Sequence, residues 1–293
     1  MVTVVWRGDF PDPFVLRSHG RYYAYATETG GLDVQVMTSP DLRSWSHLGN
    51  ALAALPRWAE PGHTWSPAVL ERPHGYVLYY ATRLRAEHRQ ALSVAVADRP
   101  EGPFTDTSTA PLVYQRSRGG SIDPDPFVDV DGTAYLLWKS DDNALGGRTV
   151  LWVRRLRPDG LGFGGRPVKV LRHRFGWESP LVEAPSLVRA GDRYHLLYSA
   201  GRWESSTYGV GHATGPAPTG PFTVTSQDGP WLHGPHGPGG QCVVEDAGGR
   251  LHLAYHAWLD DRVGYAQGGV RALHVDALDL SQREPRLLGP PGG

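Results

Sequence analysis

Short runs of alternating apolar and polar residues, joined by turn residues, recur along the whole chain. In residues 12–25, Pro-Phe-Val-Leu is followed by Ser-His-Gly-Arg and then by Tyr-Tyr-Ala-Tyr. Such alternation on both sides of a Gly-containing turn predicts two antiparallel strands. Windows of about 10 to 18 residues with helical apolar spacing are missing from the sequence, so the pattern predicts an all-β protein.

This hairpin pattern occurs five times at nearly constant spacing. The segments begin at Asp12, Ser66, Asp125, Ala184 and Gln241, which are 54, 59, 59 and 57 positions apart. A repeat of this length in a turn-rich β sequence is typical of a propeller with one four-stranded blade per repeat. We therefore predict a single five-bladed β-propeller domain over residues 1–293. A solenoid is the alternative, but it would leave sheet edges exposed at its ends.

The residues after these segments supply candidates for the outer strands of each blade. Apolar stretches at 34–37, 92–96 and 208–212 are each followed by a further aromatic residue, namely Trp45, Phe104 and Phe222. The Gly- and Pro-rich stretch 228–240 falls just before the fifth segment. We predict that it is a loop approaching the propeller axis.

Composition narrows the function classes. The 37 Gly and 25 Pro supply many turns, and the 10 Trp and 13 Tyr suit strands and carbohydrate-facing surfaces. With 29 Lys+Arg against 30 Asp+Glu there is no basic excess for a nucleic-acid backbone. No apolar run approaches the about 18 residues of a membrane span, so no membrane partner is expected.

The compartment is predicted from the start of the sequence and from cysteine usage. The first residues carry no signal-peptide pattern, so a cytoplasmic location is expected, or a secreted one if a leader was removed. The single cysteine, Cys242, can form no disulfide within the chain. The two lysines, Lys139 and Lys169, among the 29 basic residues are assigned no function.

Acidic residues stand where the innermost strands open. In a propeller these positions converge on one mouth of the axis, and Asp12, Asp123, Asp125 and Glu183 occupy them. Converging carboxylates repel each other, and burial disfavours their charge further, so a metal or a catalytic demand usually compensates. Hydrolysis of a glycosidic bond is such a demand. Asp-Pro also opens ordinary turns, so the matched positions matter more than any single residue.

Three motifs at these positions resemble glycoside hydrolase family 43, whose five-bladed propellers cleave arabinan, arabinoxylan and xylo-oligosaccharides. They are Phe-Pro-Asp-Pro-Phe at 10–14, Ser-Ile-Asp-Pro-Asp-Pro-Phe at 121–127 and Val-Glu-Ala-Pro-Ser at 182–186. The resemblance runs through all five repeats, over roughly residues 6–280. Each motif alone is weak, whereas their order and spacing are fairly specific.

The resemblance implies a role for each carboxylate. Asp12 matches the general base that activates water, Glu183 matches the general acid, and Asp123 matches the residue that tunes the pKa of the acid and orients it. Asp125 is the alternative for the third role, because it fills the Asp-Pro-Phe position that Asp12 fills in the first repeat. The family inverts anomeric configuration, which requires a base and an acid about 6.5–9.5 Å apart.

Further substrate-binding residues follow from the resemblance. Trp65 and Trp203 are expected to stack on sugar rings, with core packing as the alternative for Trp65. Arg271 is expected near the carboxylates, with a structural ion pair as its alternative, and Asp125 and Gln241 are additional candidates. For Tyr208, we predict ordinary strand packing rather than a place in a sugar subsite.

Two departures from the family pattern concern metal and substrate. Gly240 stands where many members carry the His of Gly-Pro-Gly-His, so an axial calcium is in doubt; Gln241 or His236 are the candidates to replace that His. We expect that no metal and no cofactor is required. The second repeat opens with Trp65-Ser-Pro-Ala68 where many members have Trp-Ala-Pro-Asp, so one acidic contact is missing.

The expected activity is that of an inverting glycoside hydrolase. It releases L-arabinofuranose from arabino-oligosaccharides or arabinoxylan side chains, so its partner is a pentose-containing oligosaccharide. A β-xylosidase or an endo-arabinanase on the same scaffold are the alternatives. A sugar-binding propeller without catalysis is the alternative from another class.

Overall fold

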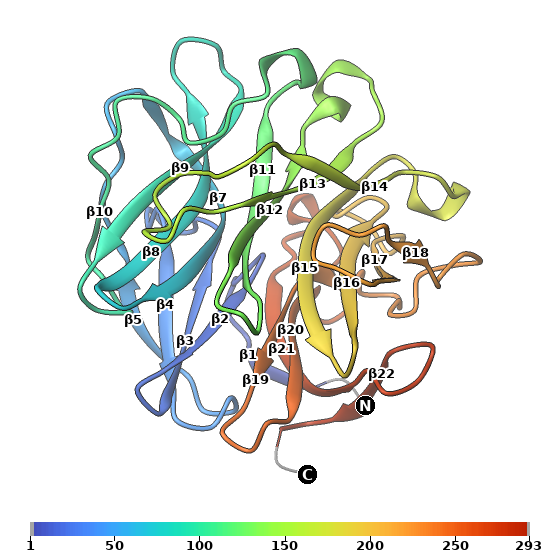
Figure 1. The fold of residues 1–293 in the computed structure, drawn as a ribbon. Helices are drawn as coiled ribbons and strands as arrows, with labels where there is room; N and C mark the ends of the chain where they lie inside the picture. Colours follow the sequence, from blue (N-terminus) through green and yellow to red (C-terminus); the bar gives the residue numbers. More distant parts are fainter. Residues whose placement is uncertain (1–2, 292–293) are drawn as a thin grey trace.

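Five sheets, antiparallel except for one outer strand pair, surround a central axis in the computed structural model, which describes residues 3–291 (Figure 1). Each hairpin predicted from the sequence forms the two inner strands of one sheet, so the predicted five-bladed β-propeller is confirmed. Helical structure among the described residues is limited to four short 3-10 turns, η1 (Arg116–Arg118), η2 (Asp142–Leu145), η3 (Gly176–Glu178) and η4 (Tyr265–Gln267). None of the helices in residues 3–291 is long and apolar enough to cross a bilayer.

The strands of each blade follow one another outward from the axis in chain order, except that β6 (Leu52–Ala54) and β1 (Val4–Trp6) join the outer edges of blades 2 and 5. Blade 1 contains β2 (Phe14–Ser18), β3 (Arg21–Ala26), β4 (Gln35–Ser39) and β5 (Ser46–Asn50). Blade 2 contains β7 (Ala59–Arg72), β8 (Gly75–Leu84), β9 (Gln90–Ala97), β10 (Phe104–Thr105) and β6 (Leu52–Ala54). Blade 3 contains β11 (Ser121–Val128), β12 (Ala134–Ser140), β13 (Val150–Arg155) and β14 (Val168–Arg172).

The last two blades complete the ring. Blade 4 contains β15 (Val182–Ala190), β16 (Arg193–Ala200), β17 (Gly209–Gly215) and β18 (Thr223–Val224). Blade 5 contains β19 (Gly239–Glu245), β20 (Leu251–Trp258), β21 (Arg271–Asp279), β22 (Arg286–Gly289) and β1 (Val4–Trp6).

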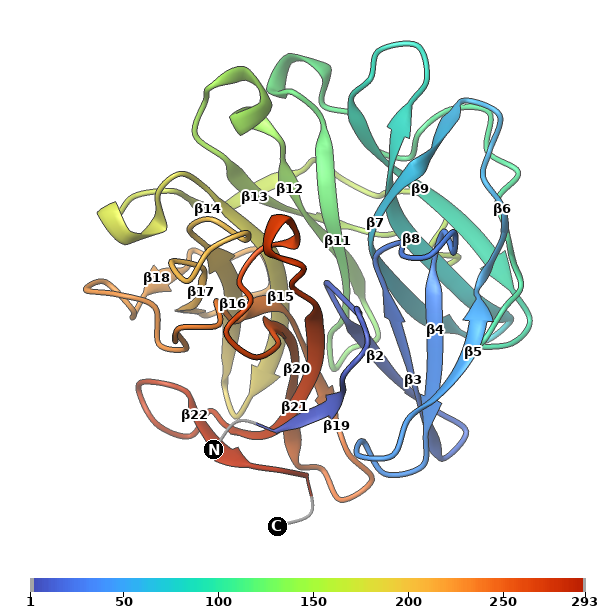
Figure 2. The same cartoon turned by 180° about the vertical axis from the view of Figure 1, so that it is seen from behind.

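The first strand of the chain closes the ring. β1 pairs antiparallel with β21, with Val4 opposite His274 and Trp6 opposite Leu273. The dark-blue N-terminal strand therefore lies against a red strand near the other end of the chain (Figure 2). The two ends of the sequence share one sheet, which ties blade 5 to the start of blade 1.

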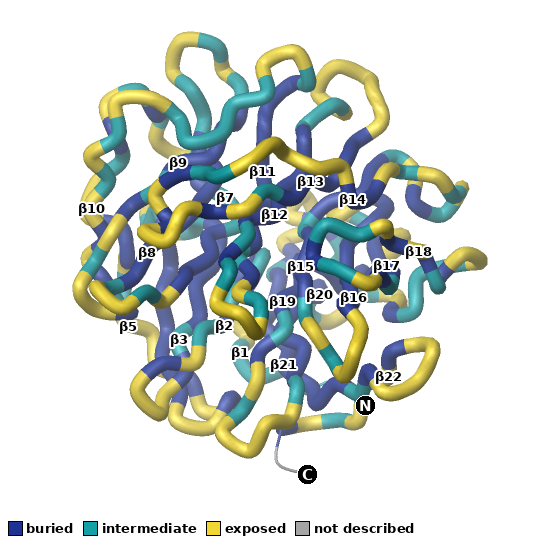
Figure 3. Tube along the Cα trace, viewed as in Figure 1, coloured by how far each residue is buried: buried dark blue, intermediate teal, exposed yellow. Residues whose placement is uncertain are grey.

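Apolar side chains fill the spaces between neighbouring blades. Five buried clusters occur, one for each pair of adjacent blades. The trace is accordingly buried along the inner strands and exposed at the turns (Figure 3). Because every blade is packed on both faces, the inner strands and the residues that open them are held firmly in place.

One position on the innermost strand of each blade, or just before it, adopts a left-handed backbone. We call these the slot residues: Asp12 (φ 52°), Ser66 (φ 47°), Asp123 (φ 56°), Ala184 (φ 45°) and Gly240 (φ 57°). In blades 2 to 5 the pairing of the inner strand shifts register around this position, as a β-bulge does. The first residues of the third and fifth repeat segments, Asp125 and Gln241, lie two residues and one residue after the slot residues of their blades.

Candidate active site

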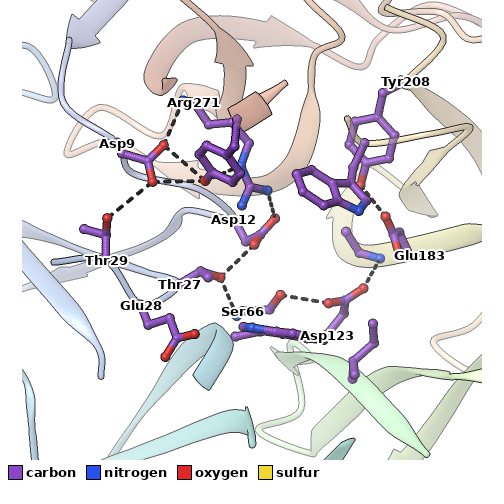
Figure 4. Close-up of a pocket in the computed structure, with 15 residues that line it drawn as sticks. Asp9, Asp12, Thr27, Glu28, Thr29, Ser66, Asp123, Glu183, Tyr208 and Arg271 are labelled. Carbon is purple, nitrogen blue, oxygen red and sulfur yellow. Dashed lines mark hydrogen bonds and ion pairs between the residues drawn. The ribbon is translucent and has the colours of Figure 1, made fainter. Parts of the chain in front are cut away.

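A cavity of about 390 Å³, the main cavity, lies where the slot residues meet (Figure 4). Its volume is at the lower end of the range for small-molecule sites, roughly 300–1,000 Å³. Six of the residues singled out from the sequence line it: Asp12, Trp65, Asp123, Glu183, Trp203 and Arg271. The other lining residues are Asp9, Thr27, Glu28, Thr29, Ser66, Ile122, Ala184, Tyr208 and Tyr265.

Asp12, the expected general base, is held on three sides. Its Oδ2 accepts a hydrogen bond from Thr27 Oγ1 at 2.7 Å, and its Oδ1 lies 3.6 Å from Nη1 of Arg271. Its backbone N–H donates to Nδ1 of His256 at 3.0 Å. Its side chain stays 21% exposed. This arrangement orients the carboxylate and leaves part of it open to the main cavity.

Asp123 is buried and accepts two hydrogen bonds. Ser66 Oγ donates to its Oδ1 at 2.8 Å, and the N–H of Ala184 donates to its Oδ2 at 2.9 Å. Burial and the charge of Glu183 raise the pKa of Asp123 to about 7, against the lowering effect of Lys139 and of the Ala184 N–H. Asp123 therefore interacts directly with the expected general acid.

Glu183 immediately precedes the slot residue of blade 4. Tyr208 Oη donates to its Oε1 at 2.8 Å, and Lys139 Nζ lies 3.3 Å from its Oε2. Burial raises the pKa of Tyr208 well above its usual value, so its hydroxyl remains a donor. The prediction of mere strand packing for Tyr208 is corrected here, because its hydroxyl belongs to the site.

Lys139 is a site residue that the sequence analysis missed. It lies on β12 with 1% of its side chain exposed, and its Nζ contacts Asp141 at 3.0 Å as well as Glu183. Burial alone would lower its pKa, but the surrounding carboxylates raise it to about 12. The signal in the sequence was a lysine inside an otherwise apolar strand. Lys139 and Arg271 are the buried cations that compensate the converging carboxylates.

Arg271 lies in an aromatic cage. Its guanidinium is 4.8 Å from the ring centroid of Trp203, 5.2 Å from that of Tyr265 and 5.9 Å from that of Trp258. Its Nε donates to Tyr265 Oη at 3.0 Å, and Tyr265 in turn donates to Asp9 at 3.0 Å. These contacts fix the cation beside Asp12. Trp203 remains 37% exposed at the main cavity.

The opposite wall of the main cavity carries Trp65 and Glu28. Trp65 packs edge-on against His63, with ring centroids 6.4 Å apart. Burial raises the pKa of Glu28, which the indole of Trp65 partly opposes. Glu28 is a further carboxylate that no motif had indicated, because it follows a strand rather than opening one.

Asp125 and Gln241 do not line the main cavity. They line a narrow cavity of about 30 Å³, the axial cavity, together with the prolines that follow the slot residues. Asp125 accepts the N–H of Leu187 at 3.2 Å, and burial raises its pKa to about 8. Gln241 donates to the carbonyl of Ala184 at 2.6 Å and accepts from Ser199 at 2.7 Å. Both residues connect neighbouring blades, and the bulge between Ile122 and Asp125 separates the two aspartates.

Gly240 supplies no side-chain ligand for a metal at the axis, and the ring nearest to it is that of His256. A Cβ added to Gly240 would lie 2.6 Å from the ring of His256 and 2.8 Å from Oδ1 of Asp12, so no larger side chain fits there. Burial lowers the pKa of His256 to about 3, so its ring is neutral. The side chain of Gln241 hydrogen-bonds to Ala184 and Ser199. Within residues 3–291, His, Cys, Asp and Glu side chains form no group of three or more suited to a metal.

Known proteins share this arrangement of blades. A solved structure described as a thermostable family-43 glycoside hydrolase is 26% identical, with a TM-score of 0.84 over 97% of this chain and 94% of that one. A second, described as an endo-1,4-beta-xylanase from Bacteroides thetaiotaomicron, is 26% identical, with a TM-score of 0.81 over 99% and 97%.

Two curated relatives are similar over most of the chain. Beta-D-galactofuranosidase xynD of Aspergillus niger is 27% identical over 75% of this chain and 65% of its own length. The extracellular exo-alpha-(1->5)-L-arabinofuranosidase ArbA of Cellvibrio japonicus is 26% identical over 73% of this chain and 66% of its own length. The chain thus spans about two thirds of the length of these relatives.

A family profile covers the segments that carry the carboxylates of the main cavity. The family profile described as Glycosyl hydrolases family 43 matches residues 2–275, which is nearly the whole propeller. The chain belongs to glycosyl hydrolases family 43.

Proposed function

We propose that this chain is an inverting glycosidase that hydrolyses terminal α-L-arabinofuranosides and so releases L-arabinofuranose from the ends of oligosaccharides. The observation that carries the proposal is the meeting of Asp12, Asp123 and Glu183 in the main cavity with three different sets of partners. An ionised carboxylate beside a cation suits a base, and a carboxyl pair that repels when both members are ionised retains a proton for the acid.

The proposed reaction takes place in one step. A water molecule held by Asp12 attacks the anomeric carbon, and its proton passes to the Asp12 carboxylate. The glycosidic carbon–oxygen bond breaks as Glu183 gives its proton to the leaving oxygen. Asp123 takes part in neither of these two proton transfers. Its negative charge beside Glu183 favours the state in which Glu183 holds the proton.

The choice of substrate is supported by the curated relatives. One is described as an exo-acting L-arabinofuranosidase and another as a β-D-galactofuranosidase. These two sugars share the same five-membered ring configuration, and the hexose carries one further CHOH group. The small volume of the main cavity favours a single terminal sugar. The β-D-galactofuranoside is therefore the second candidate.

A panel of 4-nitrophenyl glycosides tests the substrate. We expect the highest kcat/KM for the α-L-arabinofuranoside, followed by the β-D-galactofuranoside, with the β-D-xylopyranoside lower. Proton NMR of the first product formed should show the inverted anomer. Preference for the xyloside would replace the proposed substrate, and binding of the panel without turnover would favour a sugar-binding protein.

Glu183→Gln tests the assignment of the acid. We expect a loss of about 10²–10⁴-fold in kcat on methyl α-L-arabinofuranoside, and a smaller loss on the 4-nitrophenyl glycoside, whose leaving group needs less protonation. The matched control is Glu245→Gln, at an exposed position at the end of β19. Equal turnover of the methyl glycoside by Glu183→Gln and wild type would contradict the proposal.

A further inference from the structure

The slot residue of blade 2 carries a hydroxyl where blades 1 and 3 carry carboxylates. Ser66 has a left-handed backbone (φ 47°), which points its N–H and its side chain toward different blades. Its N–H donates to Thr27 Oγ1 of blade 1 at 2.9 Å, and its Oγ donates to Asp123 Oδ1 of blade 3 at 2.8 Å (Figure 4). Ser66 is thus in contact with both halves of the carboxylate cluster.

Thr27 and Ser66 link Asp12 to Asp123 through three hydrogen bonds. Thr27 Oγ1 accepts from the N–H of Ser66, so its own hydrogen is free to point at Asp12 Oδ2, 2.7 Å away. The hydroxyl of Ser66 points the other way, at Asp123. Each carboxylate therefore receives a donor whose direction is fixed by its neighbour.

The proton of the Asp123–Glu183 pair is subject to opposing influences. Lys139 lies 3.3 Å from Glu183 Oε2, and this contact favours an ionised Glu183 with the proton on Asp123. Burial acts on Asp123 in the same sense. The donors to Asp123, which are Ser66 Oγ and the Ala184 N–H, act in the other sense because they stabilise its ionised form.

Other charged and titratable groups face this pair from each packed element. Tyr208, before β17, donates to Glu183, and Asp141, after β12, shares Lys139. Asp12 faces the pair from blade 1, where Arg271 of β21 balances it and His256 of β20 is neutral. None of these groups donates to Asp123, so Ser66 is the side chain that acts on it directly.

We propose that Ser66 is the positioning residue that keeps Asp123 as a hydrogen-bond acceptor and thereby directs the proton of the pair onto Glu183. The inference rests on the proposed function, in which Glu183 is the acid. Ala184 contributes only its backbone to Asp123, so Ser66 is the partner that a substitution can remove while the slot backbone is kept.

The test compares Ser66→Ala and Ser66→Gly with Ser186→Ala. Glycine tolerates φ 47°, so Ser66→Gly separates loss of the hydroxyl from backbone strain. Ser186 is the matched control, because it is a buried serine on β15 whose Oγ accepts the N–H of Val243 and touches no carboxylate of the site. All three variants are first checked for wild-type circular dichroism.

In both Ser66 variants, kcat/KM should fall more for a substrate with a poor leaving group than for one with a good leaving group. A hydrogen bond to a charged group corresponds to about a tenfold effect or more, so we expect that loss on methyl α-L-arabinofuranoside and less than about threefold on the 4-nitrophenyl glycoside. The basic limb of the kcat/KM pH profile should move to higher pH, because Asp123 then holds the proton that it shares with Glu183 more tightly. Equal losses on both substrates with unmoved limbs would overturn the proposal and leave Ser66 a structural role.

A second readout does not depend on turnover. In protein labelled with ¹³C at glutamate carboxyls, the Glu183 signal is identified by its absence in Glu183→Gln. We expect this signal to reach its ionised position at lower pH in Ser66→Ala than in wild type. Identical titration of the Glu183 signal in Ser66→Ala and in wild type would overturn the inference about Ser66. Wild-type turnover by Glu183→Gln would overturn the proposed function instead.

Discussion

At the scale of single residues, the partners of a carboxylate decide its chemistry more than its type does. Asp123 and Asp125 are both followed by proline and lie two positions apart, yet only Asp123 lines the main cavity, whereas both line the axial cavity. The motif spacing favoured Asp123 but left Asp125 as an alternative, because sequence spacing does not reveal on which side of a bulge each residue lies. Lys139 was missed for a similar reason, since its partner Glu183 comes from the next blade.

Asparagine substitutions should separate the two aspartates. Asp125→Asn retains an acceptor for the N–H of Leu187 and lies outside the main cavity, so we expect kcat/KM within about twofold of wild type. Asp123→Asn removes the charge beside Glu183, and we expect a loss of about a hundredfold or more. Steady-state kinetics on one arabinofuranoside compares them, and the opposite ranking would assign the third role to Asp125.

The stability of wild type and of Asp125→Asn should depend differently on pH. Burial raises the pKa of Asp125 from 3.8 to about 8, so the folded state binds this proton more tightly than the unfolded state. Its contribution to the free energy of unfolding is therefore present at low pH and is lost as the pH rises from about 4 to about 8. Urea unfolding at pH 5 and pH 8 should show Asp125→Asn gaining on wild type at pH 8. The same difference in unfolding free energy between the two proteins at pH 5 and at pH 8 would contradict this prediction.

At the scale of strands, local patterns predict hairpins well and bulges poorly. The turn between β2 and β3 was evident from its sequence, and His19 and Gly20 do adopt the positive φ values of 49° and 73° that a tight hairpin needs. The bulges at the slot residues carry no composition signal beyond small or acidic types. Of the two-residue outer strands, β10 begins at Phe104 as predicted, and β18 begins one residue after Phe222.

Gly240→Ala tests how closely blade 5 approaches the base. The new Cβ would lie 2.6 Å from His256 and 2.8 Å from Asp12 Oδ1, so Asp12 must move. A misplacement of about 1 Å can cost on the order of a hundredfold in rate, and we expect a loss of that size in kcat. Gly229→Ala is the control, since no atom lies within 4 Å of its added Cβ. Equal activity of the two variants would show that Asp12 tolerates the intrusion.

At the scale of the whole molecule, the number of blades was predictable and the closure of the ring was not. Five similar hairpins at regular spacing gave the architecture without any long-range information. The pairing of β1 with β21 joins residues as far apart as Val4 and His274, and nothing in three residues of strand indicates a partner at that distance. Contacts of this kind, like the meeting of Lys139 with Glu183, arise only when the ring forms.

Removal of residues 1–6 tests the importance of this closure. The deletion leaves an unpaired edge on β21 and exposes the packing between blades 5 and 1. Because about 1 kcal/mol corresponds to roughly 2–4 °C in a protein of this size range, we expect Tm to fall by at least several degrees. Arg7→Ala, which removes only an exposed ion pair with Asp260, should leave Tm nearly unchanged. A deletion variant with wild-type Tm would contradict a role for β1.

The left-handed backbone shared by the slot residues limits how such a ring can evolve new chemistry. Aspartate, serine, alanine and glycine already occupy these five places, and all are small or form local hydrogen bonds. Side chains branched at Cβ are strained there, so a new catalytic group is expected as a side chain unbranched at Cβ or at an adjoining residue, as Glu183 is. Exchanging side chains among the five places would alter what a substrate encounters while the surrounding sheets remain unchanged.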